Sequence, residues 1–358
     1  MLAVHDLEVR LAGHTVLDVP HLSVLRAETL ALMGPNGAGK STLLQVMALL
    51  LRPRSGRVLV AGEPASPANE LRLRRRLAVV FQEPLLLDTT VAQNVATGLR
   101  LRGFDAGRRN SRVADWLSRF GIAHLAGRQA RTLSGGEAQR TSLARAFALE
   151  PEVLLLDEPF AALDPQTRFS LLVELQETLR ETGLTAMLVT HDRNEALMFG
   201  QRVAVILAGR IAQVGDPVAV FRRPASTAVA AFVGVENVLP GIVQRCDGGL
   251  AHIALGSHSI AVVADHPVGR QVIVCLRPED ITVVLDGGRD KQTSARNTLP
   301  GTVVSVTPLG AVARIAVDCG VPLVAVVTMQ SLQELGFRPG SPVHASFKAT
   351  AAHTLPGR

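Results

Sequence analysis

Residues 34–42 read Gly34-Pro35-Asn36-Gly37-Ala38-Gly39-Lys40-Ser41-Thr42 and fit the phosphate-loop pattern GxxxxGK[ST]. The apolar run 29–33 predicts a buried strand before the loop, and residues 41–51 predict a helix with an apolar face after it. Glycines let consecutive backbone N–H groups of such a loop point at phosphate oxygens, and the following helix N-terminus adds a positive dipole. The loop therefore predicts that the protein binds a nucleoside triphosphate.

Three side chains of this loop have distinct expected roles. Lys40 is expected to bridge the β- and γ-phosphates, Ser41 to supply an oxygen ligand to Mg²⁺, and Thr42 to reach the α-phosphate. The expected cofactors are therefore ATP and Mg²⁺.

Polar residues follow three further apolar runs, each predicted to be a buried strand of a parallel sheet. The runs and the residues that follow them are 77–81 with Gln82, 153–156 with Asp157 and Glu158, and 184–190 with His191. Open α/β sheets bind ligands at the carboxyl ends of their strands. Asp157 is expected to hold Mg²⁺ through water, and Glu158 to polarise the attacking water. The alternative for two acids at a strand end, taken alone, is the start of a solvated loop.

A second element that could bind phosphate is Ser134-Gly135-Gly136, which combines a hydroxyl and two glycines ahead of a predicted helix over 137–149. The alternative is structural, because Ser134 and Glu137 also have the spacing of a capping box.

In this order, the five segments resemble the nucleotide-binding subunit of ABC transporters over about residues 1–235. The resemblance identifies Gln82 with the Q-loop, residues 134–136 with the signature, Asp164 with the D-loop and His191 with the switch histidine. It implies that Glu158, His191 and Gln82 serve catalysis, with Gln82 also near the metal. It further implies a head-to-tail homodimer, in which residues 134–136 of one copy close on the γ-phosphate held by Lys40 of the other.

Two positions depart from the family pattern. Leu11 stands where an aromatic residue usually stacks on adenine, and the chain contains no Tyr, so a weaker grip on adenine is expected. The signature continues Glu137-Ala138-Gln139, where Gln-Gln or Gln-Lys-Gln types are commoner, but residues 134–136 are intact.

The chain is expected to divide into an α/β P-loop ATPase domain, 1–235, and an all-β, OB-like domain, 236–358. The helical patterns between about 88 and 150 predict a helical subdomain within the first. Short Val-rich segments separated by Gly and Pro dominate the second. That domain contains an internal repeat, because 237–241 recurs as 297–301 and 269–277 is echoed by 340–348.

The C-terminal domain resembles the TOBE domain of bacterial importer ATPases at residues 276–280, and molybdate- and tungstate-binding Mop-type modules at 294–297 and 346–351. The residues that would hold an oxyanion are Ser294, Arg296, Lys348 and Thr350. An importer of molybdate or tungstate is expected. Sulfate, phosphate, iron or polyamine import is the alternative, as is a purely structural role for these four residues.

No apolar run approaches the roughly 18–20 residues that span a bilayer, and no secretory signal is found. We expect a cytoplasmic protein, peripheral on the inner face of the membrane through separate permease subunits, and served indirectly by an extracytoplasmic substrate-binding protein. A non-transport ABC ATPase acting on nucleic acid is a weaker alternative, because coiled-coil heptads and tandem ATPase domains are missing. An oxyanion-storage protein would not need the ATPase half.

The charge and cysteine content exclude other classes of protein. The net charge is +6, but the chain has only three lysines and its arginines are spread along it, so no nucleic-acid partner is expected. Cys246, Cys275 and Cys319 are odd in number and far apart, which argues against disulfides and a zinc site.

Overall fold

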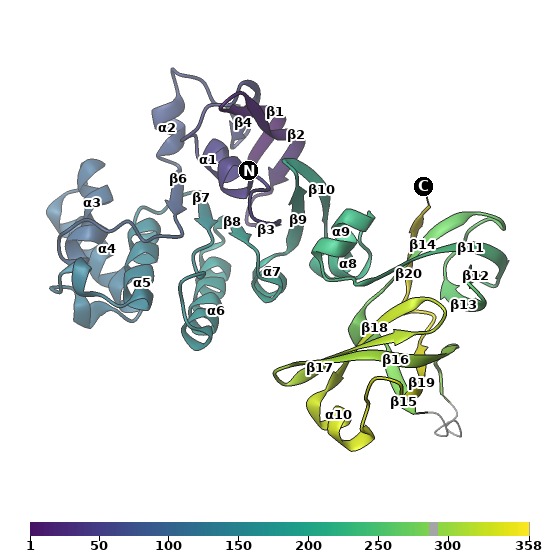
Figure 1. Cartoon of the computed structure of the whole chain (residues 1–358). Coiled ribbons are helices and arrows are strands. Elements are labelled where there is room, and N and C mark those ends of the chain that lie inside the picture. The colour runs from purple at the N-terminus through teal and green to yellow at the C-terminus, as the bar shows by residue number, and fades with distance from the viewer. Residues whose placement is uncertain (286–292, 358) are drawn as a thin grey trace. The chain divides into compact units, whose positions relative to one another are not determined.

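The computed structural model describes residues 1–285 and 293–357, which form two compact units, Met1–Val220 and Phe221–Arg358 (Figure 1). The division precedes the predicted boundary at residue 235. The reason is that Arg277 of the C-terminal unit donates hydrogen bonds to the carbonyl oxygens of Phe221 (2.7 Å) and Val233 (3.2 Å). These carbonyls belong to the ends of α8 (Pro217–Arg222) and α9 (Thr227–Phe232). No helix in the described ranges is long and apolar enough to cross a bilayer.

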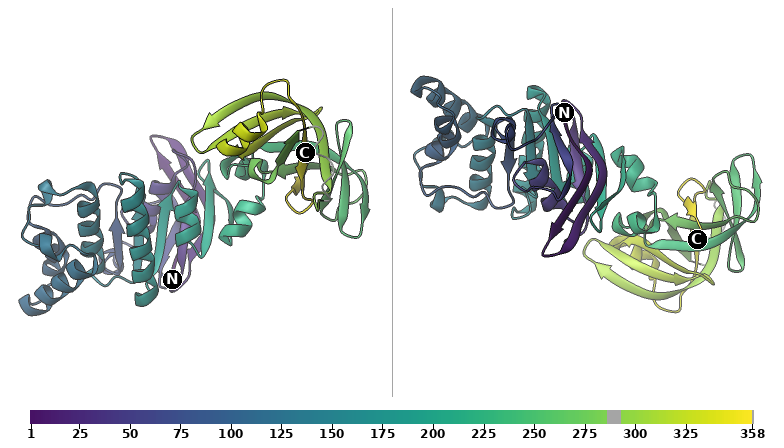
Figure 2. Two further views of the ribbon diagram at one scale, coloured as in Figure 1. Left: turned by 90° about the horizontal axis from the view of Figure 1, so that it is seen from below. Right: turned by 90° about the horizontal axis from the view of Figure 1, so that it is seen from above.

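The N-terminal unit is built on a six-stranded sheet with the order β10-β9-β3-β8-β7-β6 (Figures 1 and 2). The bounds are β3 Thr29–Met33, β6 Leu77–Val80, β7 Val153–Asp157, β8 Thr185–Thr190, β9 Arg202–Leu207 and β10 Arg210–Gly215. All neighbouring strands are parallel except the β9–β10 hairpin. Because β6, β7 and β8 are parallel neighbours, the residues that follow them lie at one edge of the sheet, as the sequence predicted.

A smaller antiparallel sheet packs against one side of this core. Its order is β2-β1-β4-β5, with bounds β1 Leu2–Leu11, β2 His14–Val24, β4 Ser55–Val60 and β5 Glu63–Pro64. Helix α1 (Lys40–Met47) shares one apolar core with both sheets. The helix ends earlier than the predicted residue 51, because Leu49 adopts a left-handed conformation with φ of 60°.

Helices cover the other face of the six-stranded sheet, where alternate residues of β6, β7 and β8 join a second apolar core. The helices are α3 Val91–Leu101, α4 Ala106–Arg119, α5 Gly135–Phe147, α6 Pro165–Thr182 and α7 Arg193–Phe199, with α2 Glu70–Arg74 elsewhere in the unit. The first three form the predicted helical insertion. Side-chain caps begin them, since Thr90, Asp105 and Ser134 each accept a backbone N–H of the first turn.

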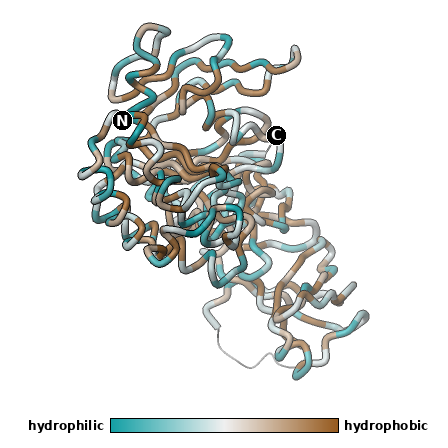
Figure 3. Tube along the Cα trace, turned by 90° about the vertical axis from the view of Figure 1, so that its left-hand side faces the viewer, coloured by the Kyte–Doolittle hydropathy of each residue, from teal (hydrophilic) through white to brown (hydrophobic). Residues whose placement is uncertain are grey.

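The C-terminal unit contains two five-stranded sheets, β13-β12-β11-β14-β20 and β15-β19-β16-β17-β18. The first comprises β11 Asn237–Asp247, β12 Leu250–Leu255, β13 His258–Val263, β14 Gln271–Leu276 and β20 His353–Pro356. The second comprises β15 Thr282–Leu285, β16 Asn297–Leu309, β17 Val312–Asp318, β18 Pro322–Thr328 and β19 Pro342–Phe347. The helix α10 (Met329–Leu335) connects β18 to β19. Both sheets contribute to one apolar core. Figure 3 shows hydrophobic (brown) and hydrophilic (teal) residues interspersed along the whole chain.

The predicted internal repeat has a structural counterpart, because β11 to β14 of one sheet correspond to β16 to β19 of the other. Two buried asparagines begin the equivalent strands β11 and β16. Asn237 exchanges hydrogen bonds with the backbone of Val324 (2.7 and 2.9 Å), and Asn297 does the same with Ala261 (2.7 and 2.9 Å). Each asparagine therefore binds the third strand of the other half, and the two halves interlock through their equivalent positions.

Candidate nucleotide site

The phosphate loop joins β3 to α1, and its glycines are required by the backbone. Gly37 and Gly39 have φ of 78° and 97°, which favour glycine. A Cβ at Gly39 would also come within 2.5 Å of the Leu17 side chain. Gly39 caps α1 without any side-chain hydrogen bond, so the first N–H groups of the helix are left to bind an anion.

Lys40 is almost fully buried within this loop, with 6% of its surface exposed. Its Nζ donates hydrogen bonds to the carbonyl oxygens of Gly34 (2.9 Å) and Pro35 (3.2 Å) and lies 3.4 Å from Glu158 Oε1. The ammonium is thus fixed between the loop backbone and a carboxylate, and its binding to phosphate stays a prediction of the sequence pattern.

Ser41 and Asp157 bring two oxygen atoms together. The Ser41 hydroxyl donates to Asp157 Oδ1 over 3.0 Å, joining the start of α1 to the end of β7. Burial raises the pKa of Asp157, the hydrogen bond from Ser41 opposes this shift, and the charge of Glu158 adds to it. A hydroxyl and a buried carboxylate are hard oxygen ligands of the kind that Mg²⁺ prefers, so the residues present fit that ion.

Glu158 lies between Lys40 and His191. Its Oε2 is 2.9 Å from His191 Nδ1, while its backbone N–H donates to the carbonyl of Val189 (3.0 Å). The backbone of Glu158 has φ of 43°, a left-handed conformation that costs a non-glycine residue about 1 kcal/mol or more. Strain of this kind is typical of functional sites, and here it turns the carboxylate from the strand towards Lys40 and His191.

Gln82 follows β6 and is exposed. Within the described ranges its side chain makes no hydrogen bond, so the structure does not join it to the contact network of residues 40, 41, 157, 158 and 191. Leu11, at the end of β1, is also exposed, at 43%, and offers only an aliphatic surface.

Ser134 caps α5 and forms the full capping box with Glu137. The Ser134 N–H donates to Glu137 Oε2 (2.7 Å), its hydroxyl donates to the same oxygen (2.9 Å), and the Glu137 N–H donates weakly to the hydroxyl (3.4 Å). The capping box, which was the alternative to phosphate binding for this segment, is therefore formed. It does not exclude binding, because residues 134–136 are exposed or half-buried and face a cavity.

That cavity has a volume of about 490 Å³ and is shared with the turn around Asp164. Asp164 caps α6 by accepting the N–H groups of Gln166 (3.1 Å) and Thr167 (3.0 Å). Residues 134–136 and Asp164 both line the cavity, whereas none of residues 34–42 does. Within one protomer, this cavity thus brings the signature turn together with Asp164 and not with the phosphate loop.

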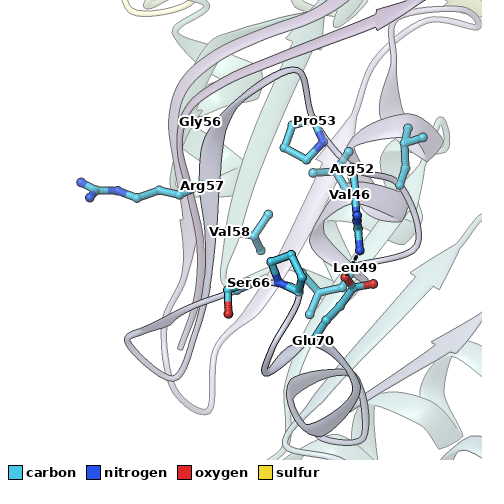
Figure 4. A pocket seen from close by; sticks show the side chains of 12 residues that line it. Val46, Leu49, Arg52, Pro53, Gly56, Arg57, Val58, Ser66 and Glu70 are labelled. Carbon is cyan, nitrogen blue, oxygen red and sulfur yellow. Dashed lines mark hydrogen bonds and ion pairs between the residues drawn. The ribbon is translucent and has the colours of Figure 1, made fainter.

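Another cavity, of about 210 Å³, lies at the far end of α1 (Figure 4). Val46, Leu49 and Val58 line it, Arg52 and Glu70 pair over 3.0 Å at its edge, and Arg57 points away from it. It contains none of the predicted site residues, so it is not part of the candidate nucleotide site.

The four predicted oxyanion residues are all exposed. Ser294 and Arg296 precede β16, and Lys348 and Thr350 follow β19; these strands are paired, with Asn297 opposite Phe347. Both segments therefore leave the same end of one ladder. No hydrogen bond within the described ranges joins these four side chains, so the predicted cage is not formed by direct contacts. Its nearest hydroxyl pair, one step into the ladder, is Thr298 with Ser346 at 3.1 Å.

Sequence reasoning missed the side chains that link these elements. Arg168 on α6 contacts the carbonyl of Leu163 and the carboxylates of Asp192 and Glu195, and Arg145 on α5 donates to the carbonyls of Pro84 and Leu85. Their contacts join segments that are distant in sequence. The one available signal was for Arg145, which lies within the predicted helix over 137–149.

Two family models match the chain, one described as ABC transporter over residues 17–161 and one as TOBE domain over residues 293–354. Among curated relatives, a molybdate/tungstate import ATP-binding protein of Pyrococcus horikoshii is 39% identical, over 93% of this chain and 94% of the relative. A sulfate/thiosulfate import ATP-binding protein of Chromobacterium violaceum is 37% identical, over 99% of this chain and 95% of the relative. An Fe(3+) ions import ATP-binding protein of Streptomyces coelicolor is 40% identical, over 86% of each chain.

Solved structures share the fold of the N-terminal unit. A component of an ABC transporter complex of Clostridium perfringens matches with a TM-score of 0.58 and 33% identity, over 66% of this chain and 94% of that chain. A dimeric ATP-binding cassette bound to ADP and phosphate matches with a TM-score of 0.56 and 27% identity, over 61% of this chain and 99% of that chain. These matches confirm the predicted α/β fold and, with the relatives and family models above, show that the chain belongs to the ABC transporter ATPases, as an ATP-binding subunit of the import type.

Proposed function

We propose that the chain hydrolyses ATP with Glu158 as the residue that polarises the attacking water. The observation that carries this assignment is the position of the Glu158 carboxylate, 3.4 Å from Lys40 and 2.9 Å from His191. A carboxylate beside a phosphate-binding cation can accept a proton from water at the γ-phosphate, and a neighbouring imidazole can orient it. The test is ATP hydrolysis by the full chain, which should be lost in Glu158→Gln.

The remaining residues of the site are proposed to bind the nucleotide. Backbone N–H groups of residues 34–39 would surround the phosphates, Thr42 would reach the α-phosphate, and Lys40 would exchange its carbonyl partners for β- and γ-phosphate oxygens. Ser41 and Asp157 would hold Mg²⁺, with Gln82 approaching it from the end of β6. The ion would neutralise charge that develops on the phosphates.

We further propose that the site is completed by a second copy of the chain. Residues 134–136 and Asp164 line a cavity that contains no residue of the phosphate loop, which supports a triphosphate supplied by a second copy. A similar cassette bound to ADP and phosphate is dimeric in its solved structure. In a head-to-tail homodimer, the Ser134 hydroxyl and the N-terminus of α5 would meet the γ-phosphate of the partner's nucleotide.

As an import subunit, the chain is proposed to work on the inner face of the membrane, bound to separate permease subunits, with an extracytoplasmic binding protein delivering substrate. The exposed leucines 85 and 87 beside Gln82 support docking of a permease there, since 58% and 48% of their surfaces are exposed.

The proposed substrate is an oxyanion, molybdate or tungstate first. Relatives of similar identity carry the descriptions sulfate/thiosulfate, Fe(3+) and spermidine/putrescine import, so these substrates are the competing candidates. An oxyanion, rather than Fe(3+) or a polyamine, is favoured by the cations Arg296 and Lys348, which stand exposed at one end of the β16–β19 ladder. Calorimetry of the full chain with molybdate, tungstate and sulfate tests whether this end binds an anion.

A further inference from the structure

Arg168 joins two loops that the proposed mechanism treats separately. It lies in the first turn of α6, and its Nη2 donates to the carbonyl of Leu163 over 3.3 Å, beside Asp164. Its Nη1 lies 3.5 Å from Asp192 Oδ2, and its Nε lies 3.9 Å from Glu195 Oε1. One guanidinium therefore contacts the turn after β7 and the loop after β8.

The loop after β8 is bound firmly around His191. Asp192 caps α7, because its Oδ1 accepts the N–H groups of Asn194 (2.7 Å) and Glu195 (3.2 Å) while Oδ2 faces Arg168. On the other side of His191, the Thr190 hydroxyl donates to Glu195 (2.5 Å) and accepts the Asp192 N–H (3.0 Å). Thr190 and Asp192, which flank His191, thus belong to one hydrogen-bonded cluster with Glu195. Arg168 brings a positive charge to this cluster.

The electrostatics make this cluster sensitive to small movements. Glu195 is 6% exposed, and its burial raises the pKa of its carboxyl group. Arg168 Nε is buried and has no hydrogen-bond partner in the described structure, although Glu195 lies only 3.9 Å away. A buried donor without a partner is costly, and an approach of about 1 Å would give it one. A shift of α6 relative to α7 would therefore change the free energy of the cluster.

We infer that Arg168 is a positioning residue for ATP hydrolysis, which transmits the position of the Asp164 turn to His191. The turn carries Asp164 at the cavity that residues 134–136 share, so it would move when a second copy docks. Arg168 would carry that movement to Asp192 and Glu195, and His191, which directly precedes Asp192, would move relative to Glu158. This inference rests on the proposed roles of Glu158, His191 and the second copy.

The experiment compares Arg168→Met with Arg180→Met in the full chain. Arg180 lies on the same helix, is exposed, and shows no hydrogen bond or ion pair in the described structure, so it controls for loss of charge from α6. We expect Arg168→Met to lower kcat about tenfold or more, since small misplacement of a catalytic group is costly, while KM for ATP stays within about twofold. Arg180→Met should leave both constants unchanged. An unchanged kcat in Arg168→Met would overturn the inference.

A second pair of variants separates positioning from simple packing. Asp192→Asn keeps the helix cap but removes the charge that faces Arg168, so it should lower kcat, as Arg168→Met does. If Arg168 acts through His191, the double variant Arg168→Met, His191→Ala should be no slower than His191→Ala alone. If the kcat of the double variant falls by the product of the two single losses, Arg168 does not act through His191. If Arg168→Met does not fold, Arg168→Lys and Asp192→Asn decide the matter, and wild-type kcat in both would overturn the inference.

Failure of the inference can be told apart from failure of the proposed function. If Glu158→Gln hydrolyses ATP like the wild type, the proposed mechanism is wrong whatever Arg168 does. If Glu158→Gln is inactive and Arg168→Met is fully active, the mechanism stands and only the inference fails.

Discussion

His191 Nδ1 lies 2.9 Å from one carboxylate oxygen of Glu158, and the other oxygen lies 3.4 Å from Lys40 Nζ. The two neighbours come from different elements, the end of β8 and the start of α1. A carboxylate held in this way responds both to the phosphate loop and to the loop that follows β8. The arrangement leads to predictions for Glu158 and His191, and other contacts lead to predictions elsewhere in the chain.

Glu158→Gln should lower ATP hydrolysis by at least about a hundredfold, because the amide keeps the size of the side chain but cannot accept a proton. Binding of ATP should persist, since Lys40 and residues 34–39 are unchanged. We expect an ATP-dependent dimer to accumulate on size-exclusion chromatography with light scattering. A variant that stays monomeric in ATP and hydrolyses at the wild-type rate would remove Glu158 from the mechanism.

His191→Ala should lower kcat by roughly a hundredfold with little change in the dissociation constant for ATP, because the imidazole contacts Glu158 rather than the phosphate loop. His21→Ala is a suitable control, since His21 is exposed on β2 and packs against His5 with a ring separation of 4.6 Å. Steady-state hydrolysis and equilibrium nucleotide binding together make the test. Equal rates for the two variants would exclude His191 from catalysis.

Glu137 should contribute to acid stability of the helical subdomain. Hydrogen bonds from the backbone N–H and hydroxyl of Ser134 lower the pKa of Glu137 below its ordinary value of 4.5. The charged side chain therefore stabilises the folded state above about pH 4.5, and this stabilisation is lost as the pH falls through the folded-state value. Glu137→Gln keeps an acceptor for the capping box but does not titrate, so its free energy of unfolding should fall less on acidification.

Trp116 provides the measurement for that prediction. It is the single Trp of the chain, and its ring lies 5.0 Å from that of Phe147 on α5. Urea unfolding followed by Trp fluorescence at about pH 7 and pH 4 gives the loss of stability in the wild type and in Glu137→Gln. Ser134→Ala, which removes the cap itself, should cost about 1 kcal/mol at neutral pH. Identical pH dependence in Glu137→Gln and the wild type would contradict the assignment.

The equivalent asparagines of the repeat should have equivalent effects. Replacing Asn297 by Ala leaves the N–H and carbonyl of Ala261 without partners, and Asn237→Ala does the same to Val324. Each change should cost roughly 2–3 kcal/mol of stability in the C-terminal unit. Thr298→Ala removes only an exposed hydroxyl pair on the same strand and should stay within about 0.5 kcal/mol.

Hydrogen exchange at the Ala261 and Val324 amides measures the two asparagine variants directly, because each amide donates to one of the side chains. Exchange should accelerate at the amide whose partner is removed, and spread through the unit if the halves depend on each other. If only one asparagine matters, the two halves of the repeat are not energetically equivalent.

The phosphate loop could be predicted from the sequence because its chemistry is local. Glycine at positions 37 and 39 and lysine at position 40 are required by backbone geometry and charge within eight residues. The strands β3, β6, β7 and β8 followed from apolar runs, and so did the residues that end them, but the order of these strands in the sheet did not. The short α1 could not be predicted in this way, because the left-handed conformation of Leu49 depends on packing and not on its own side chain.

Contacts between distant segments account for most of what sequence reasoning missed. The interlock of the halves through Asn237 and Asn297 needed the register of both sheets, whereas the repeat itself was visible as recurring letters. Likewise, nothing in residue 168 alone indicates that its partners are 192 and 195, since the fold brings them together. The predicted cage at Ser294 and Thr350 was assembled from motifs, and the structure shows only that their segments leave the same end of one ladder.

Lys348 and Arg277 occupy equivalent positions of the repeat, but only one is free to meet a ligand. Arg277 is 8% exposed and bound to the carbonyls of Phe221 and Val233, whereas Lys348 is exposed and makes no hydrogen bond or ion pair in the described ranges. Lys348→Ala should therefore weaken molybdate binding at least about tenfold, the loss expected for one charge-assisted hydrogen bond, without lowering the melting temperature. Arg277→Ala should instead lower the melting temperature.

Calorimetry of the full chain with molybdate, tungstate and sulfate separates these outcomes, with Arg338→Ala as a control for loss of one exposed cation from the same unit. Heat with molybdate that disappears in Lys348→Ala and persists in Arg338→Ala would support an anion site at the end of the β16–β19 ladder. If the wild type gives heat only with sulfate, the result favours sulfate over molybdate as the substrate. If no anion gives heat, the exposed cations have a structural or partner-binding role, and the C-terminal unit does not sense the transported ion.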